Sequence, residues 1–128
     1  MPKKIHKLEY LPDYNFIVIG ITSDEMDYKL IWEINKALAW NLERKENYKF
    51  YNKITKAEYD FPLFTYTDED SYIHYKLVSN KHNGFTLLDE LKNLDYLLLV
   101  YDETGSDHLG FISEKLRETK AVRGVFNI

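Results

Sequence analysis

The carboxylates that precede the second long apolar run of this 128-residue sequence are the first candidates for chemistry. Glu90 lies in the link before the run, and Asp95 and Tyr96 stand where the run begins. A carboxylate at the start of a central strand, with another in the preceding loop, can orient a ligand or bind a cation of a partner. The same carboxylates can instead accept backbone N–H groups in the turn that enters the strand. We favour the structural interpretation and keep the binding role as its alternative.

A second group of candidates lies on a segment whose apolar residues recur at helical spacing. Glu33 lies on the side away from the apolar stripe, Trp32 lies at its edge, and Asn35 borders it, where an amide is disfavoured unless it forms hydrogen bonds. In a functional interpretation, Glu33 and Asn35 reach a ligand or a partner. In a structural one, Asn35 holds a neighbouring loop and Trp32 covers the edge of the stripe. The structural interpretation is again favoured, because buried polar groups usually find partners within the protein.

Other common chemistries lack the residues that they need. The sequence has no cysteine, which excludes disulfides, thiolate zinc sites and cysteine nucleophiles. Its four histidines show no metal-ligand spacing, and its five glycines form neither a dinucleotide-binding fingerprint nor a P-loop. The acidic run Asp68–Asp70 lacks the spaced ligands and central glycine of a calcium loop, so we interpret it as a solvated turn. We therefore expect no metal, no cofactor and no catalytic residue that the sequence alone can identify.

The overall composition indicates a folded domain with an acidic balance. Lys and Arg number 17 against 21 Asp and Glu, which gives a net charge of −4. The lysines are scattered, which argues against nucleic acid as the main partner, because such domains carry clustered basic residues. The longest apolar runs, Phe16–Ile21 and Tyr96–Tyr101, are too short to span a bilayer. The sequence predicts one domain over residues 1–128, located in the cytoplasm.

The two apolar runs are also the strongest predictors of the fold. Phe16–Ile21 and Tyr96–Tyr101 are apolar at both parities, which is typical of central strands covered on both faces. After the first run, Thr22 and Glu25 have capping-box spacing and predict a helix from about Asp24 to Ala39. Ser106 is the predicted N-cap of a second helix that ends near Thr119 or Lys120, and Ala121–Ile128 is expected to close the chain as a strand.

Between the two helices the pattern predicts an antiparallel meander. Pro62 places one of its strands at a sheet edge or at a strand start. The Asn83-Gly84 pair predicts a type I′ turn, because both central residues of that turn need positive φ. The expected strands are Glu46–Tyr51, Phe61–Thr67, Ser71–Ser79 and Phe85–Leu88. The sequence thus predicts an α+β fold: a two-layer sandwich in which two helices cover a mainly antiparallel sheet, ferredoxin-like with extra strands.

The segment from Leu88 to Tyr96 resembles the signature of the IPExxxVDY family, a bacterial family named for that string. Glu90, Asp95 and Tyr96 match, whereas Leu88 and Asp89 stand in place of the Ile and Pro, and Leu94 in place of the Val. Further similarity lies in Asp27–Leu30 with Trp32, Glu33, Asn35 and Lys36, in Ser79–Lys81 before Gly84, and in Phe126 and Ile128. The family comprises small cytoplasmic proteins with no assigned activity or ligand, so the resemblance implies no mechanism.

Two functions from different classes are consistent with these observations. The first is a non-catalytic binding module that engages a protein partner or associates with itself, since the sequence is rich in Tyr and Trp, which are favoured at interfaces. The alternative is a small-molecule-binding or enzymatic domain with a pocket near Glu90, Asp95 and the first helix. An exposed aromatic surface favours the first function, and an enclosed pocket with carboxylates favours the second.

Overall fold

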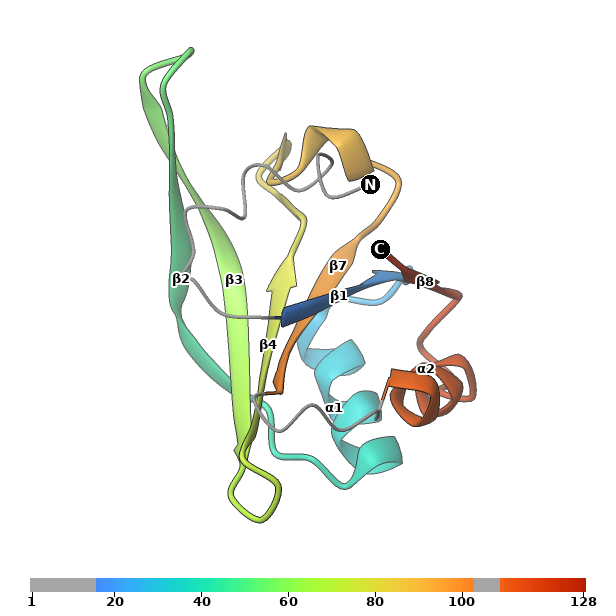
Figure 1. Ribbon diagram of the computed structural model, residues 1–128. Coiled ribbons are helices and arrows are strands. Elements are labelled where there is room, and N and C mark those ends of the chain that lie inside the picture. Colours follow the sequence, from blue (N-terminus) through green and yellow to red (C-terminus); the bar gives the residue numbers. More distant parts are fainter. Residues whose placement is uncertain (1–15, 103–108) are drawn as a thin grey trace.

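The computed structural model describes residues 16–102 and 109–128, which form a sheet layer and a helix layer (Figure 1). The main sheet has six strands in the order β2-β3-β4-β7-β1-β8, each antiparallel to its neighbours. Both helices, α1 (Asp27–Leu38) and α2 (Leu109–Arg117), pack on the same face of this sheet. The strands are β1 (Phe16–Thr22), β2 (Glu43–Asn52), β3 (Ala57–Asp68), β4 (Ile73–Ser79), β7 (Tyr96–Asp102) and β8 (Gly124–Asn127).

The predicted fold class is confirmed. Four strands, in the order β8-β1-β7-β4, have the arrangement of a ferredoxin-like sheet, in which the last strand lies beside the first. Strands β2 and β3 extend that sheet beyond β4. No helix in the described part of the chain is long and apolar enough to cross a membrane.

The helix-covered face of the sheet carries the larger core. Ile19 and Ile21 of β1 and Leu98 of β7 are buried there, against side chains of both helices. The helix side chains in this cluster are Leu30, Ile31 and Ile34 of α1 and Ile112 and Leu116 of α2. The 3.6-residue spacing that predicted α1 therefore marks the residues that α1 buries.

The opposite face of the sheet is covered by the segment between β4 and β7. This segment contains a small two-stranded sheet, β5 (Lys81–His82) with β6 (Phe85–Thr86), and the short 3₁₀ helix η2 (Asp89–Leu91). Its side chains Leu87, Leu88 and Leu94 are buried against β1 and β7. Because helices cover one face and this segment covers the other, β1 and β7 are apolar at both parities, as their sequences predicted.

Local details near α1 differ from the predictions. The helix begins at Asp27, three residues later than expected, and its N-cap is Met26, which makes no side-chain cap hydrogen bond. The predicted capping box is therefore wrong. The hydroxyl of Ser23 accepts from the N–H of Glu25 instead, at 3.0 Å, and donates to the carbonyl of Ala121, at 2.6 Å. Ser106, the predicted N-cap of the second helix, lies outside the described residues.

The meander also differs from the prediction at Pro62. Strand β3 lies between β2 and β4, so the expected edge position is wrong. Pro62 falls where the β2 register shifts between Lys45 and Tyr48, and pairing with β4 begins only at Leu63. A proline is accommodated there because neither neighbouring strand needs its missing N–H.

The predicted turn between β5 and β6 is confirmed. Asn83 has φ 53° and Gly84 has φ 83°, which are the positive values that a type I′ turn needs. The returning strand is shorter than expected, because it covers Phe85–Thr86 and pairs only with β5. The next residues, Leu87 and Leu88, turn inward to cover the main sheet.

Candidate functional site

Asp95 joins three segments that are far apart in the sequence. One carboxylate oxygen accepts from the backbone N–H of Ser23 at 2.9 Å, and the other receives Lys81 Nζ at 3.2 Å. The Asp95 backbone donates to the Ile21 carbonyl and accepts from the Asn80 N–H, both at 2.9 Å. The side chain, at 30% exposure, thus holds the β1–α1 loop beside the β4–β5 link. These contacts are of the kind that the structural interpretation expected.

Tyr96 anchors the same loop through its side chain. That side chain is buried, and its hydroxyl donates to the backbone carbonyl of Glu25 at 3.2 Å. Burial raises the pKa of Tyr96 to about 12, with smaller contributions from the charges of Asp27 and Asp95. Tyr96 therefore holds its proton, and its hydrogen bond to the loop, well into the alkaline range.

This pKa predicts a specific loss of stability at high pH. An unfolded tyrosine ionises near 10.0, whereas the pKa of native Tyr96 is about 12, so between these values the native state binds more protons than the unfolded state. Its contribution is complete below pH 10 and is lost as pH rises toward 12. We expect Tyr96→Phe to make the decline in unfolding free energy over this range shallower by about 1–2 kcal/mol. Urea titrations at successive pH values measure the decline.

The unfolding free energy at neutral pH separates the hydrogen bond of the Tyr96 hydroxyl from the effect of its ionisation. There Tyr96→Phe is expected to cost about 1 kcal/mol, because it removes one hydrogen bond. Tyr75, whose pKa burial also raises to about 12, provides a second case in the helix-side core. If Tyr96→Phe declined as steeply as the wild-type protein above pH 10, the assigned pKa would be wrong.

Glu90 does not join the other candidates. It is exposed on η2, and the neighbouring Leu88 and Leu91 pack over the sheet face opposite α1. The structure therefore brings Asp95 and Tyr96 to the loop that enters α1, while it places Glu90 on the other side of the sheet. The cleft described below is lined by neither Glu90 nor Asp95.

The polar atoms of the Asn35 side chain form hydrogen bonds with the segment that follows α1. Its side-chain oxygen accepts from the N–H of Leu42 at 2.9 Å, and its Nδ2 donates to the carbonyl of the same residue at 3.3 Å. Ala39 ends the helix in the left-handed conformation, with φ 58°, and Trp40 donates its N–H to the Asn35 carbonyl. Asn35 thereby closes the turn between α1 and β2.

Trp32 instead projects from the helix layer. Its side chain is 57% exposed, and Tyr28, one turn earlier, is 61% exposed. The ammonium groups of Lys29 and Lys36 lie 5.8 and 5.0 Å from the centroid of the Trp32 ring, and Lys29 also pairs with Glu33 at 3.7 Å. We call Tyr28, Lys29, Trp32 and Lys36 the Trp32 surface. The other tryptophan, Trp40, is partly buried, with its ring centroid 4.0 Å from that of Tyr75.

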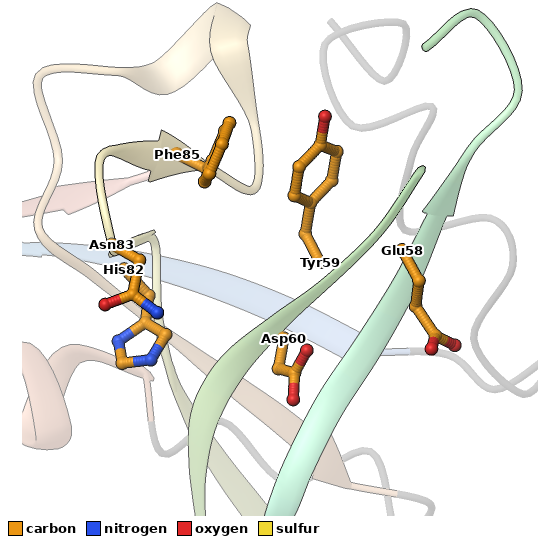
Figure 2. Close-up of a pocket in the computed structure, with 6 residues that line it drawn as sticks. All are labelled: Glu58, Tyr59, Asp60, His82, Asn83 and Phe85. Carbon is orange, nitrogen blue, oxygen red and sulfur yellow. The ribbon is translucent and has the colours of Figure 1, made fainter. Parts of the chain in front are cut away.

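A small cleft lies where sequence reasoning placed no site. It has a volume of about 210 Å³ and lies between β3 and the β5–β6 hairpin. Figure 2 shows the Tyr59 and Phe85 rings side by side, with the Asp60 carboxylate below them, and the ring centroids are 4.4 Å apart. The remaining lining residues are Glu58, His82 and Asn83. Two features of the sequence lie next to this cleft. They are Pro62, which precedes the point where β3 begins to pair with β4, and the Asn83-Gly84 turn.

Comparisons with known proteins give no indication of the function of this chain. No family model, curated protein or solved structure matches this chain. Within residues 16–102 and 109–128, no group of three or more His, Asp or Glu side chains is placed to hold a metal ion. Function therefore has to be inferred from exposed surfaces, clefts and the partners of each polar side chain.

Proposed function

We propose that this protein is a non-catalytic interaction module that engages a protein partner through the Trp32 surface. The observation that carries the proposal is the exposure of Trp32, at 57%, beside the 61% exposure of Tyr28 on the same flank of α1. Met26, which precedes the helix, adds a further side chain at 66% exposure. Large side chains of this kind supply most of the binding energy at protein interfaces, and tryptophan and tyrosine are the most enriched.

The charges around the ring indicate the chemistry of the partner. Lys36 and Lys29 both lie beside the Trp32 ring, and only Lys29 has a carboxylate partner on the helix. A partner segment that places an apolar side chain on the ring and a carboxylate near Lys36 would match both features. We therefore propose a partner with an acidic and apolar binding segment.

The alternative function, a small-molecule-binding or enzymatic domain, has less support. Asp95 and Asn35 hold backbone groups of this chain, and Glu90 lies on the other side of the sheet. The cleft beside Tyr59 has about 210 Å³, below the roughly 300–1,000 Å³ typical of small-molecule pockets. This cleft would thus give a substrate or cofactor little enclosed surface to bind.

The test is recovery of the partner with a matched pair of variants. Tagged protein is isolated from the cells that naturally produce it, and the complex is weighed by native mass spectrometry. We expect Trp32→Ala to weaken the complex about tenfold or more, as truncating a hot-spot residue does. Phe111→Ala is the control, because Phe111 has the same 57% exposure but lies on α2.

Both variants should fold, since the side chains that they remove are exposed. Lys36→Glu is expected to weaken the same complex and to reduce its sensitivity to salt. Loss of the complex in Phe111→Ala but not in Trp32→Ala would contradict the proposal. A retained small molecule without any protein partner would support the alternative function instead.

Membership of the IPExxxVDY family is also proposed, on the pattern of Glu90, Asp95 and Tyr96. Two of these residues hold the loop between β1 and α1, through the Ser23 N–H and the Glu25 carbonyl. In this proposal the signature serves the fold by fixing the start of α1, and α1 in turn presents Trp32.

A further inference from the structure

The two edges of the main sheet are protected to very different degrees. Strand β2 forms one edge and β8 the other (Figure 1). Strand β2 carries charged residues along its length and a register shift between Lys45 and Tyr48, two features that discourage pairing with another strand. Strand β8, with the sequence Gly-Val-Phe-Asn, has neither a charged residue nor a register shift. Within the described residues, no strand pairs with the outer side of β8.

The hydrogen bonds between β1 and β8 show which backbone groups face outward. Ile128 donates its N–H to the carbonyl of Val18 at 3.0 Å, in the same register that pairs Phe126 with Gly20. Inward and outward directions alternate along an antiparallel strand. The N–H and C=O groups of Val125 and Asn127 therefore point away from β1, where they are available to a further strand.

The side chains on this edge form an apolar patch. Phe126 is 50% exposed and Ile128 is 41% exposed. Both lie on the face opposite the helices, because Phe126 pairs with Gly20 while the neighbouring Val125 is buried in the helix-side core. The Phe126 ring lies over Gly124, within 3.1 Å of the point where a Cβ would be. Gly124 thus leaves room for the Phe126 ring of its own strand, which forms the apolar surface above this edge.

We propose that β8 pairs antiparallel with β8 of a second copy of this chain, joining the two six-stranded sheets into one. In the register that pairs all residues from 124 to 128, Phe126 lies opposite Phe126 of the second copy. Val125 of each copy then faces Asn127 of the other, so the outward backbone groups exchange hydrogen bonds. Ile128 lies opposite Gly124 of the second copy, where it meets the Phe126 ring that lies over that glycine.

The second copy is the occupant that this edge fits best, because the edge is complementary to itself. Strand β8 has no charged side chain to repel its own copy. The same register matches donors with acceptors, Phe126 with Phe126, and Ile128 with the Phe126 ring that lies over Gly124. A two-fold axis through Phe126 generates all of these contacts at once. The inference involves no residue of the Trp32 surface, so it can fail while the proposed function holds, and the reverse.

A single-cysteine crosslink tests the register directly, since the natural sequence contains no cysteine. In a non-hydrogen-bonded antiparallel pair the Cα atoms are about 4.5 Å apart, which is within the range for a disulfide. We expect Phe126→Cys to form a disulfide-linked dimer under mild oxidation. Ile128→Cys and Tyr51→Cys are the controls: the register separates the two copies of residue 128, and Tyr51 lies on the β2 edge.

Self-association of the protein without cysteine is tested with a matched pair at Asn127, an exposed residue. Asn127→Pro removes an outward N–H that β1 does not use, whereas Asn127→Ala keeps it. Both variants lose the contact between the Asn127 side chain and the Ser113 hydroxyl, at 3.2 Å, so any cost to folding from that contact is shared.

In sedimentation velocity, we expect wild-type protein and Asn127→Ala to dimerise with the same constant, and Asn127→Pro to dimerise at least tenfold more weakly. Thermal unfolding establishes that each variant is folded. Crosslinking at position 126 no faster than at 128 or 51 would overturn the proposed register. A wild-type protein that stays monomeric at high concentration would overturn the dimer itself.

Discussion

Replacing Asn80 with alanine is expected to lower the free energy of unfolding by about 3 kcal/mol or more, the effect of leaving several buried polar groups unpaired. Asn80 is completely buried at the end of β4. Its Nδ2 donates to the carbonyls of Leu91 and Leu94, both at 2.9 Å, and its Oδ1 accepts from the Leu88 N–H at 2.9 Å. One side chain thus satisfies three backbone groups of the segment that covers the second core.

The expected loss is large because alanine leaves those backbone groups without partners in a region that water does not reach. Each unsatisfied group costs about 1–3 kcal/mol. Asn80→Asp is expected to be at least as destabilising, although the two side chains have the same shape. A carboxylate cannot donate, so it would place an oxygen against the Leu91 and Leu94 carbonyls. Urea unfolding of both variants, followed by circular dichroism, measures these losses.

Asn93→Ala is the matched control, because Asn93 belongs to the same segment but is exposed. Its unfolding free energy is expected to stay within about 0.5 kcal/mol of the wild-type value. A similar value for Asn80→Ala would mean that the segment from 80 to 95 holds its conformation without the Asn80 hydrogen bonds.

The sequence predicted the fold best where burial or a turn left a local pattern. Strands β1 and β7 are apolar at both parities because both of their faces are covered, and α1 shows helical spacing because only one flank is buried. Asn83 and Gly84 predicted their own turn because the required φ values select those residue types. In each case the cause of the structure lies within a few residues.

The sequence could not predict features whose cause lies far along the chain. Asn80 is one of several polar residues near a turn, and its partners lie up to 14 residues away. Thr22 and Glu25 suggested a capping box, but the hydroxyl near the start of α1 that forms hydrogen bonds is that of Ser23, which donates to Ala121, 98 residues away. Pro62 suggested an edge because proline has no N–H to donate to a neighbouring strand. Its tolerance inside β3 depends on the register shift in β2 and on where pairing with β4 begins. Only the assembled sheet contains that information.

The same difference applies to the candidate site. Asn35 stood out because an amide beside an apolar stripe needs partners, and Asp95 because it is a carboxylate at the start of a central strand. The structure supplies backbone partners for both. Trp32 lies outside the set of α1 side chains that the core buries, and it is 57% exposed. The strand character of β8 was visible in the sequence, but its position at an edge required the strand order.

Gly20→Ala is expected to destabilise the protein by about 1–3 kcal/mol, the usual range for overpacking in a core. Gly20 lies in β1 between Leu97 and Phe126, and a Cβ there would overlap Leu94 Cδ1. Leu94 is buried, so its methyl group has no solvent to move into. Removing a glycine would by itself stabilise the protein by about 0.4–1 kcal/mol through the unfolded chain. The contact with Leu94 is expected to outweigh that gain.

A double-mutant cycle with Leu94→Ala isolates this contact. Leu94→Ala alone is expected to cost about 2–4 kcal/mol, because it leaves a cavity against the sheet. In that background the Cβ at position 20 no longer meets a methyl group, so Gly20→Ala should become neutral or stabilising. The expected coupling between the two positions is about 2 kcal/mol, within the range observed for residues in contact. Unfolding free energies of the four proteins in urea complete the cycle.

Gly110→Ala provides the contrast that makes this prediction specific. Gly110 lies in α2, and among the described residues no atom outside its own turn of helix lies within 4 Å of the point where its Cβ would be, so alanine there should stabilise the helix by about 0.5–1 kcal/mol. The same substitution is thus expected to have opposite signs at the two positions. Equal effects would mean that Leu94 does not press on β1, and that the segment from 80 to 95 lies less closely on the sheet. A Gly20→Ala that is destabilising in the wild-type protein but not in Leu94→Ala would instead show that this segment presses on β1 at Gly20.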